Sequence, residues 1–281
     1  MTQTKVAVVT GGASGIGRAL AGALVARGDT VVVADIDDEA AKNVADELQS
    51  GGSGTVYGTG LDVCDADAVA ALMRSTRDEH GRLDVVFNNA GIAVGGGVEE
   101  LTLDHWNRTI DVNLRGVVHG VHAAYPILLE QGFGHIVNTA SLAGLVPPPM
   151  MGPYTATKHA VVGLSLGLRA EAAGRGVKVS VVCPGFVDTP LLDHANPGLP
   201  QTDAGARARE FATRVQRKLY TTDALARDVL RGLDRNKALI VAPLSGRAAW
   251  RAARLAPGLV VRTAAREATR LRNQESGSTG R

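Results

Sequence analysis

Short, continuously apolar segments alternate with stretches of helical length through most of this chain. Strands that are apolar along their whole length are typical of a parallel sheet covered by helices on both faces. The alternation of strand and helix predicts an α/β fold, a doubly wound parallel sheet with right-handed crossovers. The predicted strands are 5–10, 30–34, 55–60, 85–87, 135–139, 177–182 and 238–241, and the predicted helices include 18–27, 39–49, 103–130, 154–173 and 204–219.

The composition indicates one large domain with a sizeable core, since 45% of the 281 residues are apolar. The two cysteines, Cys64 and Cys183, have no pairing spacing, which favours a reduced, cytoplasmic setting and no metal site. The first apolar run ends at Val9, too short for a signal peptide. No run reaches the ~18 apolar residues that a membrane span needs.

A glycine-rich turn joins the first predicted strand to the first predicted helix. Gly11, Gly15 and Gly17 lie in this turn, in the segment Thr10–Gly17. Glycines at such a turn allow the backbone to approach a pyrophosphate, which the N-terminus of the following helix attracts. The context of strand, turn and helix therefore predicts a dinucleotide site.

An acidic residue supports the same prediction. Asp35 ends the second predicted strand, 18 residues after Gly17, where a carboxylate accepts hydrogen bonds from the ribose hydroxyls of an adenosine. The same charge repels a 2′-phosphate, and no Lys or Arg stands at Ser14 or beside Asp35. We therefore expect NAD in preference to NADP. The alternative is that Asp35 caps a loop or helix.

A tyrosine and a lysine stand four residues apart in a predicted helix, so that Tyr154 and Lys158 share one face. A phenol can transfer a proton to or from a substrate oxygen, but its ordinary pKa near 10 is high for a base. A neighbouring ammonium favours the phenolate, so the spacing predicts a lowered pKa for Tyr154. The alternative is an ordinary tyrosine with a snorkelling lysine.

Taken together, these motifs resemble the short-chain dehydrogenase/reductase family over roughly residues 4–245, in the family's order. The matches are the TGxxxGxG turn at 10–17, the adenine-contacting pair at 62–63, the NNAG segment at 88–91, the helix asparagine at 113, a serine at 141 with YxxxK at 154–158, and the Pro-Gly segment at 184–189. The resemblance implies a Rossmann-type fold. The residues that it assigns to the cofactor are Gly11, Ser14, Gly15, Ile16, Gly17, Asp35, Asp62, Val63, Asn89, Ala90, Gly91, Tyr154, Lys158, Pro184, Gly185, Val187 and Thr189.

The resemblance also implies a catalytic set, Asn113, Ser141, Tyr154 and Lys158. Tyr154 is then the general acid or base, Ser141 holds the substrate oxygen, and Lys158 also bonds the nicotinamide ribose. Asn113 orders a water next to Lys158. Taken singly, Ser141 is equally explained as a helix N-cap, and Asn113 as a buried amide satisfied by backbone groups.

Apolar residues follow both Ser141 and the Pro-Gly segment, and the family's lid over the substrate corresponds to about 186–222. We expect them to line a pocket for an apolar alcohol or ketone of steroid, retinoid, terpenoid or long-chain type. Packing of lid helices on the domain explains them equally well. The residues concerned are Phe186, Val187, Leu191, Leu192, Leu199, Phe211, Val215, Leu219 and Tyr220, with Leu142, Leu145, Val146 and 147–151.

The predicted function is NAD-dependent interconversion of a secondary alcohol and a ketone. Alternatives are a 3-oxoacyl thioester reductase, which a basic patch at the pocket mouth would favour, and a non-catalytic cofactor-binding module. We expect a homodimer or homotetramer and a small apolar substrate. Nucleic acid is not expected as a partner, because the basic residues lie outside the predicted catalytic domain at 1–245.

The segment 246–281 carries eight arginines against two glutamates, a net +6, whereas the rest of the chain carries −4. A helix is predicted over 258–272, which Pro257 separates from 245–255, and the end at 276–281 is expected to be disordered. Arg262, Arg266 and Arg270 form one stripe of that helix, opposite an apolar face of Val260, Ala264, Ala268 and Leu271. Such a helix can contact an anionic membrane weakly, or pack on another subunit or on the lid.

Overall fold

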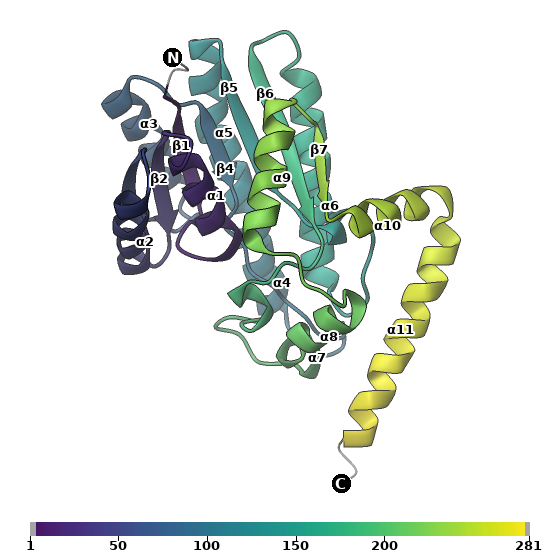
Figure 1. The fold of residues 1–281 in the computed structure, drawn as a ribbon. Helices are drawn as coiled ribbons and strands as arrows, with labels where there is room; N and C mark the ends of the chain where they lie inside the picture. Colours follow the sequence, from purple (N-terminus) through teal and green to yellow (C-terminus); the bar gives the residue numbers. More distant parts are fainter. Residues whose placement is uncertain (1–3, 279–281) are drawn as a thin grey trace.

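A parallel β-sheet forms the centre of the molecule (Figure 1). The computed structural model describes residues 4–278, with side chains described to Thr269. Within these residues the sheet has seven strands: β1 (Val6–Thr10), β2 (Thr30–Asp35), β3 (Thr55–Gly60), β4 (Val85–Asn88), β5 (Gly134–Thr139), β6 (Val177–Pro184) and β7 (Leu239–Ala242). They run in the order β3-β2-β1-β4-β5-β6-β7, and all neighbours are parallel. The doubly wound, Rossmann-type fold is confirmed.

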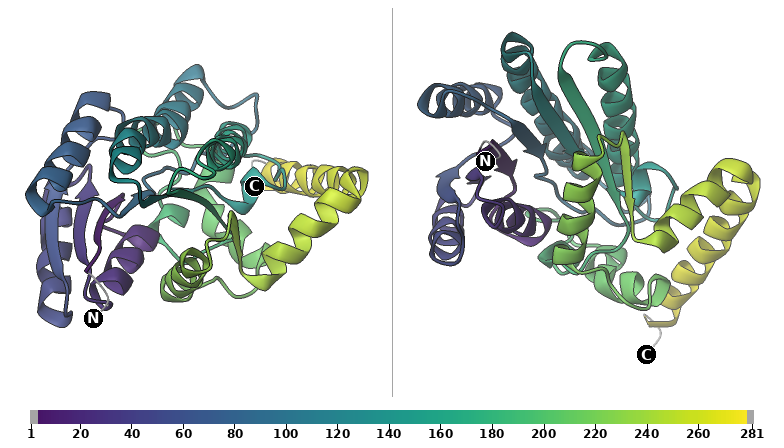
Figure 2. Two further views of the ribbon diagram at one scale, coloured as in Figure 1. Left: turned by 90° about the horizontal axis from the view of Figure 1, so that it is seen from above. Right: turned by 45° about the horizontal axis from the view of Figure 1, so that its top comes forward.

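Helices cover both faces of the sheet (Figure 2). One face packs against α1 (Gly15–Val25), α2 (Asp38–Gly51) and α9 (Thr222–Asp234). The other packs against α3 (Ala66–His80), α5 (Gly116–Gln131) and α6 (Gly152–Glu171). The strand cores are buried on both sides, as Val8 and Val9 of β1 show, each with no exposed surface. Burial on both faces explains why the strands are apolar throughout.

The order of the strands reverses at β1, which pairs with β2 on one side and with β4 on the other. Connections leave in opposite directions there, so a crevice opens at the carboxyl ends of these strands. The glycine-rich turn follows β1, Asp35 ends β2 and Asn89 follows β4. The topology therefore brings these predicted cofactor residues to one edge of the sheet.

All seven predicted strands are present, with ends displaced by no more than two residues. The predicted helix at 103–130 is α4 (Leu103–Ile110), a π-helical turn (Asp111–Arg115) and α5. The predicted helix at 204–219 is two short helices, α7 (Asp203–Ala206) and α8 (Ala208–Val215). Apolar spacing does not detect the breaks at 111–115 and at Arg207, because helix stands on both sides of each. Residues 216–219, which were predicted to be helical, lie beyond the end of α8 and are not helical.

The C-terminal segment forms two helices, α10 (Leu244–Leu255) and α11 (Pro257–Ser278). Figure 1 shows α10 leaving β7 sideways and α11 turning back toward the side of α7 and α8. Helix α11 extends over Asn273–Ser278, so the prediction of disorder is wrong for 276–278, where the helical pattern continues; residues 279–281 lie outside the described residues. Within the described residues, no helix is long and apolar enough to cross a membrane.

Candidate active site

A cavity of about 790 Å³ opens at the carboxyl ends of the strands. It extends from the ends of β2 and β3, past the glycine-rich turn and the start of α6, to α8 and α11. The predicted site residues on its wall are Gly11, Ser14, Gly15, Ile16, Asp35, Asp62, Val63, Asn89, Ala90, Gly91, Ser141, Tyr154, Lys158, Pro184, Gly185, Val187 and Thr189. The two others, Gly17 and Asn113, are buried behind this wall instead of lining it.

The glycine-rich turn is held by contacts that leave no room for side chains. Gly11 and Gly15 have φ angles of +63° and +50°, which glycine adopts at little cost. A Cβ atom on Gly17 would lie 2.0 Å from the carbonyl oxygen of Gly11. The Asn89 amide donates to the carbonyls of Thr10 (3.0 Å) and Gly11 (3.2 Å), and so fixes the turn to β4. This cradle fits the close approach of a pyrophosphate.

Asp35 lines the end of the cavity nearest β2. It also accepts hydrogen bonds from loop backbone groups, which is part of the capping role that the sequence offered as the alternative. Its Oδ2 accepts a hydrogen bond from the Ala13 amide (3.0 Å), and its Oδ1 accepts one from the Asp37 amide (3.3 Å). The carboxylate therefore helps to shape the glycine-rich turn. Each oxygen retains a second lone pair, so Asp35 can also accept from ribose hydroxyls. Ile36, which is 65% exposed, lines the wall beside it.

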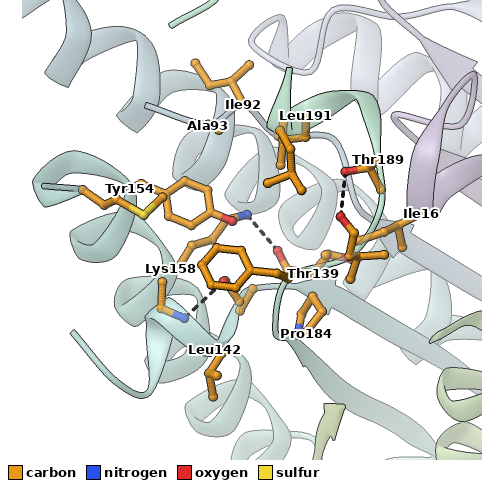
Figure 3. Close-up of a pocket in the computed structure, with 18 of the residues that line it drawn as sticks. Ile16, Ile92, Ala93, Thr139, Leu142, Tyr154, Lys158, Pro184, Thr189 and Leu191 are labelled. Atoms are coloured by element: carbon orange, nitrogen blue, oxygen red, sulfur yellow. Dashed lines mark hydrogen bonds between the residues drawn. The ribbon is translucent and has the colours of Figure 1, made fainter. Parts of the chain in front are cut away.

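Tyr154 and Lys158 lie on the first turns of α6, at the middle of the cavity (Figure 3). The Lys158 Nζ atom is 5.6 Å from the centre of the Tyr154 ring and donates to the Thr139 carbonyl at 3.0 Å. Lys158 is only 3% exposed. The spacing argument therefore places these two side chains correctly: they share one face and the same cavity.

Burial controls the protonation of this pair. It raises the pKa of the Tyr154 phenol above its ordinary value, while a hydrogen bond with the Ser141 side chain acts in the opposite direction. It lowers the pKa of the Lys158 ammonium to about 8. The prediction of a lowered Tyr154 pKa is therefore wrong for this structure, because desolvation of the phenol outweighs the hydrogen bond with Ser141.

The Lys158 pKa gives a testable dependence of stability on pH. A folded-state pKa near 8, below the ordinary value of 10.5, means that the unfolded chain binds one more proton between these values. Stability supplied through this group therefore rises with pH in that window.

We expect the free energy of unfolding of the wild type, minus that of Lys158→Met, to be flat below about pH 7.5. It should rise by up to ~1.4 kcal/mol per pH unit between pH 8 and 9.5. Denaturant titrations check this, and a constant difference across the range would contradict it.

Ser141 and Asn113 lie on neighbouring elements, and backbone groups hold both side chains. The Ser141 Oγ atom accepts from the Ala143 amide at 3.1 Å, as an N-cap does, and Ser141 also lines the cavity. Asn113 belongs to the π-helical turn and has no exposed surface. Its amide donates to the Ile92 carbonyl (2.9 Å) and accepts from the Ile92 amide (2.8 Å). Backbone groups thus satisfy Asn113, as the structural alternative predicted, and they hold the segment after β4 in place.

The apolar residues predicted for the substrate separate into two groups. The cavity wall contains Phe186, Val187, Leu191, Leu192, Phe211, Val215, Leu142, Val146, 147–149 and Met151. Leu199, Leu219, Tyr220, Leu145 and Met150 lie outside this wall. Tyr220 packs against the core and donates to Asp228 (2.7 Å), while Leu145 packs against a second core cluster. For these two residues, the packing explanation is the correct one.

Several residues of the cavity wall were not predicted from the sequence. Thr139 ends β5 and accepts the Lys158 hydrogen bond, and its position at the end of a predicted strand was an available signal. Arg108 and Ile92 also line the wall. Four residues of α11 do so as well: Val260, Thr263, Ala264 and Glu267. No local pattern indicates these last contacts, because they depend on how α10 and α11 fold back.

Comparison with known proteins is consistent with this geometry. A sequence model described as short chain dehydrogenase matches residues 5–199. The chain is 40% identical over 189 residues to a cyclohexanol dehydrogenase of Acinetobacter sp. (67% of this chain, 75% of that protein). It is 36% identical over 200 residues to a D-beta-hydroxybutyrate dehydrogenase of Rhizobium meliloti (71% and 78%).

Solved structures give the same result. A short chain dehydrogenase/reductase from Burkholderia phymatum, in complex with NAD, superposes with a TM-score of 0.83 at 34% identity, covering 92% of this chain and 95% of that one. A short-chain dehydrogenase from Sphingobium yanoikuyae, in complex with NADPH, superposes with a TM-score of 0.76 at 28% identity (92% and 94%). The two structures thus hold different nicotinamide nucleotides.

Proposed function

The chain belongs to the short-chain dehydrogenase/reductase family, and we propose that it uses NAD to interconvert a secondary alcohol and a ketone on an apolar substrate. The coarser activity, oxidoreduction between alcohols and ketones, follows from the family. The observation that carries the finer proposal is the position of Tyr154. Its side chain lines one continuous cavity between the glycine-rich turn and an apolar wall.

Proton transfer at the substrate oxygen is assigned to Tyr154. A nicotinamide cofactor, when bound, supplies or accepts the hydride. A phenol with a raised pKa keeps its proton at neutral pH, which suits donation to the carbonyl oxygen of a ketone. The Ser141 hydroxyl can hold the same oxygen, since it both donates and accepts. Lys158 and the Thr139 carbonyl lie beside Tyr154 as the next polar groups.

The residues around the glycine-rich turn fit a dinucleotide, and Asp35 favours NAD. The carboxylate lines the end of the cavity nearest β2, where a 2′-phosphate would meet its negative charge. The negative charge of Asp35 favours NAD, whereas the hydrogen bond that Asp35 accepts from the Ala13 amide shapes the glycine-rich turn. A neutral isostere separates the two effects.

We expect the wild type to bind NADH more tightly than NADPH. Asp35→Asn should narrow that gap, because it removes the charge while an amide oxygen still accepts from Ala13. Asp35→Ala should narrow the gap too, and should also weaken NADH binding through loss of that hydrogen bond. Fluorescence titrations of the two reduced cofactors measure this. Equal affinities in the wild type, or an Asp35→Asn variant with an unchanged ratio, would contradict the assignment.

The thioester alternative has less support from the cavity. An acidic carrier would favour a basic mouth, but the described wall residues include three acids, Asp35, Asp62 and Glu267, against Arg108, Lys158 and Arg214. Arg214 is paired with Glu267 at 3.0 Å. A non-catalytic module is also less favoured, because the tyrosine and lysine are both present in the cavity.

A screen of substrates tests the proposed function. Cyclic and long-chain secondary alcohols should reduce NAD at alkaline pH, and the matching ketones should oxidise NADH near neutral pH. Acetoacetyl thioesters serve as the competing class. Turnover of thioesters alone would replace the proposal with the alternative.

We further propose that residues 1–245 form the catalytic unit, with a lid at about 186–222, and that it acts in the cytoplasm as a homodimer or homotetramer.

A further inference from the structure

One face of α11 forms part of the cavity wall. Val260, Thr263, Ala264 and Glu267 line the cavity, and their spacing of three and four residues places them on a single side of the helix. Arg262 and Arg266 are exposed on the other side. This agrees with the predicted separation of basic and apolar faces as far as Thr269; the side chains of Arg270 and Leu271 lie outside the described residues.

Two attachments hold α11 over the cavity. Helix α10, which precedes it, is joined to the sheet: Arg247 donates to the Val241 carbonyl at 2.7 Å, and Trp250 packs against a core cluster. Further along, Glu267 pairs with Arg214 of α8 at 3.0 Å. The first attachment fixes α10, from which α11 starts, and the second joins α11 itself to α8.

The contact with α8 reaches the residues next to the Pro-Gly segment. The Arg214 guanidinium lies 5.6 Å from the centre of the Phe211 ring, and this ring packs edge-on against Phe186 at 5.8 Å. Phe186 follows Gly185, one of the proposed cofactor residues. The described side chains thus connect α11 to the residues that surround the proposed reaction centre.

We propose that α11 is a wall of the substrate site and limits the size of the apolar group that the enzyme accepts. The inference rests on the proposed function, because it assigns the far end of that cavity to the substrate. Val260 and Ala264 supply apolar surface there, and each methylene buried against such surface raises affinity about fourfold. An exposed ion pair contributes little by itself, so the apolar packing carries the effect.

Adjacent alanines on α11 provide a matched test. Ala264 lines the cavity, whereas Ala265 is exposed on the outer side of the same helical turn. Ala264→Trp should fill the far end and lower kcat/KM for long-chain secondary alcohols about 10-fold, while cyclohexanol turnover stays within about twofold. Ala265→Trp should leave both unchanged. Equal effects of the two variants on long and small alcohols would overturn the proposal.

A measurement without turnover separates this proposal from the proposed function. In a Cys64→Ala background, Ala264→Cys should react with N-ethylmaleimide more slowly than Ala265→Cys, and long-chain ketones with NAD, which cannot react with each other, should slow only the former. If no alcohol or ketone is turned over but this protection is seen, the proposed activity is wrong, and the proposal that α11 is a wall of the site is supported. If neither cysteine is protected and the protein sediments with anionic vesicles in a salt-dependent manner, α11 is a membrane contact and the wall is overturned.

Discussion

Tyr154→Phe should lower kcat by at least ~10²-fold, the usual size of a general acid or base contribution. The change removes the hydroxyl and keeps the aromatic ring, so packing at the start of α6 is preserved. The loss should appear in both directions of the reaction, because the same oxygen would give and take the proton. NADH affinity, followed by fluorescence titration, should change little.

Tyr57→Phe provides the control for this experiment. Tyr57 lies on β3 and is 48% exposed, outside the described cavity wall. Its substitution removes the same hydroxyl from the same protein and should leave turnover unchanged. If Tyr154→Phe retains turnover within a few-fold of the wild type, the tyrosine and lysine are a structural pair and Tyr154 does not transfer the proton.

The tyrosine also illustrates what the sequence could predict and what it could not. The four-residue spacing within a helical pattern predicts that Tyr154 and Lys158 share a face, because helix geometry is local. Their pKa values depend on how much water surrounds them, and that depends on packing by distant elements. The local argument therefore places the side chains correctly but predicts the wrong direction for the Tyr154 pKa.

Asn113 and α11 show the same limit at larger scale. The asparagine is recognisable from its motif, but its hydrogen bonds to Ile92 depend on a π-helical turn that has no signal in the apolar pattern. The two faces of α11 can be read from the periodicity of its sequence. The sequence does not identify what the apolar face contacts, because such a face fits a membrane, a subunit or a lid equally well. Only tertiary contacts such as the ion pair of Arg214 with Glu267 decide between them.

The glycine-rich turn gives the second large expected effect, through Gly17→Ala. An added Cβ would lie 2.0 Å from the Gly11 carbonyl oxygen and 2.8 Å from the Asn89 amide nitrogen. Since the first neighbour is backbone, the turn must open, and the hydrogen bonds from Asn89 to Thr10 and Gly11 must lengthen or break. Gly17 itself lies behind the cavity wall, so the effect on a cofactor is transmitted through the backbone of the turn.

We expect Gly17→Ala to weaken NADH binding by at least ~10²-fold, because a displaced turn loses about two hydrogen bonds to charged phosphate groups, each contributing ~1.5–3 kcal/mol. Gly22→Ala is the matched control in the same helix. Its Cβ would meet only the Leu48 side chain, at 3.3 Å, and alanine is a better helix former than glycine. This control should therefore bind NADH like the wild type and be at least as stable. Titration with NADH and thermal unfolding of both variants separate lost binding from lost folding. A folded Gly17→Ala protein with wild-type affinity would show that the turn does not hold the pyrophosphate.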